Sequence, residues 1–179
     1  GFTLIELLAV IVILGVLLAI AIPSVSKYIS TSKKSTYVSN AQSYVDAVIN
    51  ESLLSNYLPV NQHEGTILSF ARIRDLMQKG GKTSPYGSDF VADKSFVLIV
   101  NVATAESPVY KYYITAIDQD GYGIGEGNTS SLIEYDELKS TNIVQLGKGS
   151  GTSIIAKGET IDVKYKNETV KVTVTDIVQ

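Results

Sequence analysis

The chain of 179 residues contains no cysteine and a single histidine, His63. Without cysteine there is no disulfide bond, no cysteine-ligated zinc site and no cysteine nucleophile. One histidine cannot supply the paired spacing of the common zinc enzymes, and we interpret His63 as a surface loop residue. The formal net charge is −3, so no basic field favours nucleic acid. A domain of this composition has to be stable through packing and hydrogen bonds alone.

Charge and polarity are also missing from the start of the chain. Leu7–Ile22 contains no charged or hydrogen-bonding side chain, and one acid, Glu6, stands directly before it. As a helix, Phe2–Ile22 spans roughly 30 Å, the thickness of a bilayer's hydrocarbon core. The run is too long for a cleavable secretory signal and has no polar face for a buried core helix. A plain membrane anchor explains the length but not Glu6.

Residues 1–8 read GFTLIELL, with the apolar continuation passing through Gly15 and Pro23. This segment resembles the class III signal sequence of the type IV pilin superfamily over about the first 25 residues. The resemblance implies that prepilin peptidase cleaves between Gly1 and Phe2 and that Phe2 is N-methylated. It also implies a structural subunit rather than an enzyme, without a cofactor. Its assembly ATPase and platform protein would extract it from the membrane.

Glu6 needs a partner, because an unpaired carboxylate in hydrocarbon costs several kcal/mol. In a filament the N-terminal ammonium of a neighbouring subunit is the obvious partner, and the pairing would fix the register of the subunits. Gly15 and Pro23 weaken a helix, and the resemblance supports a segment between them that unwinds on packing. Three lysines after the apolar run lie near anionic headgroups, near subunit acids or simply in solvent: Lys27, Lys33 and Lys34.

The predicted fold is α+β, with a long N-terminal helix and an antiparallel β-sheet head. Residues 1–23 form the apolar half of the helix, residues 24–58 its amphipathic continuation, and residues 59–179 the head. The helix is expected to reach about Tyr57 and to end before Pro59. A short second helix is expected over Thr66–Lys79. Strands are expected at Ser95–Ala103, Val109–Ile117, Ile143–Leu146, Ser153–Ala156, Thr160–Tyr165 and Thr169–Ile177, the last two forming a hairpin.

The head offers two weak candidates for chemistry. Asp118 and Asp120, followed by Glu126, could hold calcium, but the same residues are typical of a turn, which we favour. The Gly81-Lys82-Thr83 sequence is not preceded by the glycine and the strand that a phosphate-binding loop requires. Nucleotide binding is therefore rejected. Between Lys111 and Lys139 every charged residue is acidic: Asp118, Asp120, Glu126, Glu134, Asp136 and Glu137. This stretch is a solvated surface or a face that meets Arg72, Arg74 or Lys82 of the next subunit.

We therefore expect a major pilin that forms a homo-oligomeric helical filament for adhesion, surface motility or biofilm formation. The precursor would lie in the cytoplasmic membrane and the filament on the cell surface. A pseudopilin of a type II-like secretion system and a minor pilin are alternatives within the superfamily. A membrane-anchored binding domain with one membrane span is the alternative of a different class.

Overall fold

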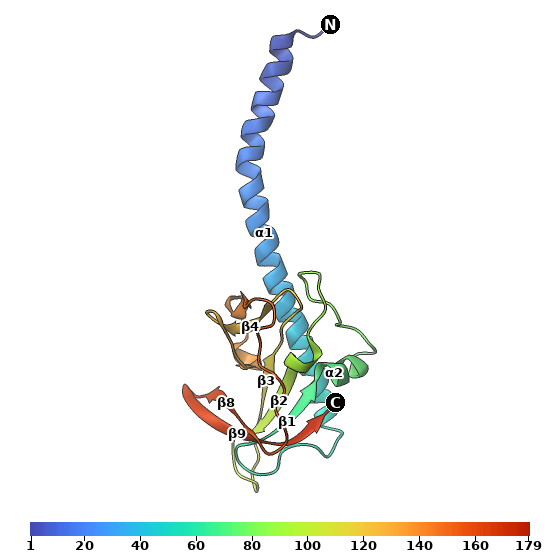
Figure 1. The fold of residues 1–179 in the computed structure, drawn as a ribbon, viewed down its shortest axis with the longest axis vertical. Coiled ribbons are helices and arrows are strands. Elements are labelled where there is room, and N and C mark those ends of the chain that lie inside the picture. The colour runs from blue at the N-terminus through green and yellow to red at the C-terminus, as the bar shows by residue number, and fades with distance from the viewer.

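The computed structural model describes residues 1–179 as a long helix that projects from a globular head (Figure 1). Helix α1 (Leu4–Ser52) has Thr3 as its N-cap and leaves every residue up to Ser32 exposed. The predicted end near Tyr57 is wrong by about one turn. The buried Ser52 hydroxyl bonds to the Ile49 carbonyl and to the Tyr112 hydroxyl, and there the chain leaves the helix.

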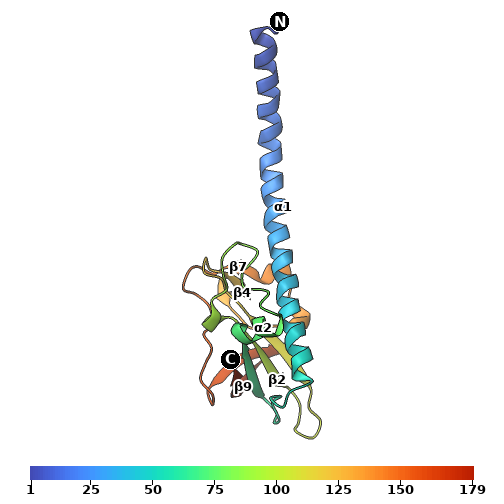
Figure 2. The same cartoon turned by 90° about the vertical axis from the view of Figure 1, so that its right-hand side faces the viewer.

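The second half of α1 lies along one side of the head (Figure 2). Its buried residues recur every three or four positions: Tyr37, Ala41, Tyr44, Val45, Val48 and Ser52. This spacing places them on one face of a helix, which explains why the helix packs with that stripe inward. The Tyr37 hydroxyl also donates to the Tyr122 carbonyl oxygen at 3.1 Å, and the Tyr37 ring meets Phe90 edge-on at 5.6 Å. Helix α1, which we call the stem, is therefore fixed to the head through its second half by both packing and hydrogen bonds.

The main sheet has six strands in the order β6-β3-β2-β1-β9-β8. Their bounds are β1 (Glu64–Ser69), β2 (Phe96–Asn101), β3 (Tyr110–Thr115), β6 (Ile133–Glu134), β8 (Thr160–Tyr165) and β9 (Glu168–Val178). A smaller sheet contains β5 (Thr129–Ser130), β4 (Tyr122–Glu126) and β7 (Ile143–Gln145). The helical elements of the head are α2 (Phe70–Leu76), η1 (Ala92–Lys94), η2 (Tyr135–Glu137) and η3 (Ser140–Asn142). The predicted α+β layout is confirmed.

The main sheet is buried on both faces. In β2 all six residues are buried, with Val97 and Ile99 in the cluster that contains the α1 stripe. Phe96 and Leu98 belong to a second cluster on the opposite face, together with residues of β8 and β9. The two edges of the sheet approach each other there, and the Tyr113 hydroxyl of β3 donates to the Lys164 carbonyl of β8 at 2.9 Å. The sheet thus curls around a core of its own.

Three further sequence predictions need correction. Residues 66–69 of the expected second helix belong to β1. Both faces of this strand are buried, so its sequence does not alternate between apolar and polar residues as that of a half-exposed strand does. The sheet is not wholly antiparallel, because β1 pairs with β9 in parallel. Ser153–Ala156 forms no strand; its Ile154 amide makes one bond to the Asp93 carbonyl at 2.8 Å. The hairpin of β8 and β9 is confirmed, with positive φ at Lys166 and Asn167 as a tight two-residue turn requires.

Candidate functional site

The tip of α1 carries a reciprocal capping box. The Thr3 amide donates to Glu6 Oε2 at 2.8 Å, and the Glu6 amide donates to Thr3 Oγ1 at 3.3 Å. The carboxylate also lies at the positive end of the helix dipole. Gly1 and Phe2 precede the helix and are exposed, so the bond between them is accessible to a peptidase. One Glu6 oxygen is thus occupied within the chain, and the other has no partner in it.

Gly15 and Pro23 lie inside a continuous helix. A Cβ added at Gly15 would meet no atom, so close packing within this chain does not require the glycine. Pro23 lacks an amide hydrogen and leaves the carbonyl of Ala19 without its usual helical donor. The neighbouring Ser24 hydroxyl bonds back to the Ile20 carbonyl at 3.3 Å. The isolated chain is helical throughout this segment, and its unwinding on assembly stays a prediction.

The exposed part of α1 is long and apolar enough to cross a membrane. Its most apolar window has a mean hydropathy of 3.1, and none of that window is buried in the structure. Large apolar side chains stay exposed from Phe2 as far as Ile29. Exposed apolar surfaces of this size are unusual in soluble monomers and require a lipid or protein environment.

Asp118 is buried and has most of its acceptor capacity filled. Its Oδ1 accepts from the amides of Asp120 and Tyr122, both at 3.0 Å, and its Oδ2 accepts from the Ser84 hydroxyl. This geometry closes the predicted turn, in which Gly121 has a φ of +92°. No group of three or more His, Asp or Glu side chains in the chain is placed to hold a metal ion. His63 lies in the turn before β1.

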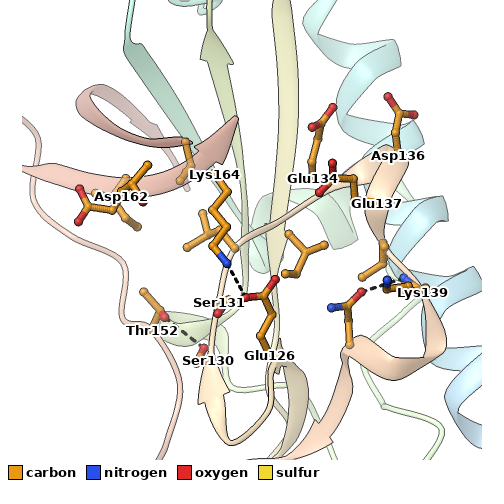
Figure 3. A pocket seen from close by; sticks show the side chains of 17 residues that line it. Glu126, Ser130, Ser131, Glu134, Asp136, Glu137, Lys139, Thr152, Asp162 and Lys164 are labelled. Atoms are coloured by element: carbon orange, nitrogen blue, oxygen red, sulfur yellow. Dashed lines mark hydrogen bonds and ion pairs between the residues drawn. The ribbon is translucent and has the colours of Figure 1, made fainter. Parts of the chain in front are cut away.

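Four of the predicted acids line a cleft of about 750 Å³ between the segment after β4 and strand β8 (Figure 3). They are Glu126, Glu134, Asp136 and Glu137, and β8 contributes Asp162 and Lys164 from the opposite wall. The Lys164 ammonium donates to Glu126 Oε2 at 2.8 Å, which raises the pKa of that lysine. Asp162 and Lys164 were missed by the sequence analysis, since only the curling of the sheet brings β8 to this place.

The cations that were expected to meet this acidic face are largely engaged within their own chain. Arg72 pairs with Glu51 at 3.1 Å, and Lys82 pairs with Asp89 at 3.0 Å. The hydrogen bond from Lys82 lowers the pKa of the Asp89 carboxyl. A contact between the acidic cleft and these cations of another subunit stays a prediction.

Comparison with known protein families gives one result. Residues 1–22 match the family model of the prokaryotic N-terminal methylation motif. No curated protein and no solved structure matches the chain. The matched segment includes Gly1 and Phe2, the capped Glu6 and most of the exposed apolar half of α1. The motif implies a membrane-anchored precursor that is processed by prepilin peptidase. The chain therefore carries the type IV pilin signature at its N-terminus.

Proposed function

We propose that this chain is a major pilin, the repeating subunit of a type IV pilus that assembles through its N-terminal helices and serves adhesion, surface motility or biofilm formation. The observation that carries the proposal is the exposed apolar first half of α1, which bears a carboxylate at its tip. After extraction from lipid, such a surface is stable only if other copies of the stem cover it.

The tip of the stem supports a register between subunits. Once Gly1 is removed, Phe2 presents an ammonium group beside the first turn of α1. One Glu6 oxygen remains free to accept this group from a neighbouring copy, while the capping box holds the side chain in place. A shifted subunit would leave a buried charge unpaired, at a cost of roughly 3–5 kcal/mol.

The test separates the charge of Glu6 from its role as a helix cap. Glu6→Gln keeps a side chain that can close a capping box but removes the charge. Thr3→Ala keeps the charge and removes the cap, which costs the helix end about 1 kcal/mol. Both variants should insert into the membrane. Electron microscopy of sheared surface material should show filaments for Thr3→Ala and few or none for Glu6→Gln.

Mass spectrometry of the same samples checks processing, with an N-methylated Phe2 expected at the terminus. Normal filament yield from Glu6→Gln would contradict the register argument. Filaments that retain Gly1 would contradict the proposed cleavage.

A membrane-anchored binding domain is the second candidate, and the acidic cleft of the head is the observation that favours it. The same microscopy discriminates between the candidates. Long filaments that contain this chain support the major pilin. Short filaments confined to the cell envelope support a pseudopilin, and a protein that never leaves the membrane supports the anchored domain.

A further inference from the structure

A second groove, of about 680 Å³, lies where the stem meets the head. Helix α1 contributes Ser26, Ser30, Lys33 and Lys34 to its wall, and the head contributes Tyr86 and Tyr122 among others. No carboxylate lines this groove. It differs in this respect from the acidic cleft.

The two lysines of the groove have no acidic partner within the chain. Both are half-buried, and neither takes part in any of the six ion pairs of the chain. The Lys33 ammonium lies 5.4 Å from the centroid of the Tyr86 ring, and this ring stacks on Tyr122 at 3.8 Å with an interplanar angle of 4°. The groove therefore presents two unpaired cations, one of them over a tyrosine ring, beside two phenol groups.

The groove lies at the membrane surface of the anchored precursor. A hydrocarbon core of roughly 30 Å takes about 20 helical residues, so a span that starts at Leu7 ends near Ser26. Lys33 follows about 10 Å further along the helix axis. Side chains of an α-helix tilt toward its N-terminus, and lysine reaches back toward the interface. Both ammonium groups are thus placed at the level of the lipid headgroups.

We propose that this groove binds the phosphate of an anionic phospholipid headgroup in the leaflet that faces the head. Lys33 and Lys34 would supply the charge. The hydroxyls of Ser26 and Ser30 would supply hydrogen bonds, since neither is bonded back to the helix as Ser24 is. Tyrosine is favoured at the membrane–water interface, because one end of its side chain is apolar and the other is polar. The proposal rests on the membrane anchor and not on the filament.

The test measures lipid binding to the full chain in detergent. Native mass spectrometry counts bound phosphatidylglycerol and phosphatidylcholine in titrations of the wild type and of Lys33→Gln/Lys34→Gln. The wild type should prefer phosphatidylglycerol. The double variant should bind it about 25-fold more weakly, roughly fivefold for each lysine. Binding of phosphatidylcholine should not change, and near-ultraviolet circular dichroism checks that the head is folded.

The matched control is Lys157→Gln/Lys166→Gln. Lys166 also lies over a tyrosine ring, 5.3 Å from the Tyr165 centroid, but on the β8–β9 hairpin of the head. This control should keep the full lipid preference. An unchanged preference in Lys33→Gln/Lys34→Gln, or an equal loss in the control, would overturn the proposal. So would inorganic phosphate that binds as tightly as the lipid.

Discussion

Val48→Ala tests whether the packing of the stem stabilises the head. Val48 is fully buried against the sheet, and the substitution removes two methyl groups. Their transfer to water accounts for about 1.6 kcal/mol, and the unfilled volume adds about 1 kcal/mol. The better helix propensity of alanine offsets about 0.5 kcal/mol. The net destabilisation is about 2 kcal/mol, or a melting temperature lower by roughly 4–8 °C.

Val25→Ala is the matched control, because Val25 lies on the same helix and is 54% exposed. Its effect on the head should stay within about 0.5 kcal/mol. Thermal unfolding of the full chain in mild detergent, followed by near-ultraviolet circular dichroism of the tyrosines, measures both variants. Equal shifts for the two substitutions would refute the reasoning, because the effect would then not depend on burial against the sheet.

Three further predictions concern the head. Asp118→Asn should lower its stability by about 1–3 kcal/mol, because the amide cannot accept all the hydrogen bonds of the carboxylate, whereas the exposed Asp120→Asn should have little effect on the melting temperature. Burial raises the pKa of the Tyr37 hydroxyl well above 10, so the native state keeps a proton that the unfolded state loses. Stability should therefore fall as the pH rises above about 10, and pH-dependent unfolding should show a weaker fall for Tyr37→Phe. Gly121→Ala should lower the melting temperature of the head much more than Gly127→Ala. Both glycines have positive φ, but only at Gly121 would the new Cβ collide with the backbone of the loop that follows β7.

The stem and the hairpin could be predicted because their sequence patterns are local. An uninterrupted apolar run with one acid at its start allows few structures, and the observed helix follows it closely. In the hairpin, the alternation of Val170, Val172 and Val174 marks one buried face, and β9 confirms it. Each of these signals depends on residues within a few positions of each other.

Strands that deviate from such a pattern were misread or missed. β1 is buried on both faces, so Ile67 and Leu68 look like part of an apolar helix face. β4 contains Gly123 and Gly125, which argue against a strand in sequence. In the structure a Cβ at Gly123 would come within 2.5 Å of the Ala116 carbonyl oxygen, so the glycine permits a close approach of the two backbones.

The functional surfaces of the head depend on contacts that no sequence spacing reveals. The acids around Glu134 were visible as a charged stretch, but Lys164 reaches Glu126 only after the sheet has curled. Likewise Lys33 meets Tyr86 across more than fifty positions of the chain. The residue types could be recognised in advance, whereas their neighbours could not.

The parallel pairing of β1 with β9 also bears on how the anchored chain matures. Glu64 of β1 lies beside Thr173 of β9, so one side of β1 stays open until the chain near position 173 has been synthesised. Until then this open side exposes unpaired amides and carbonyls. Such an edge can pair with another chain in place of β9. The interval between the synthesis of the two strands is therefore the period in which the precursor can misfold and aggregate through β1.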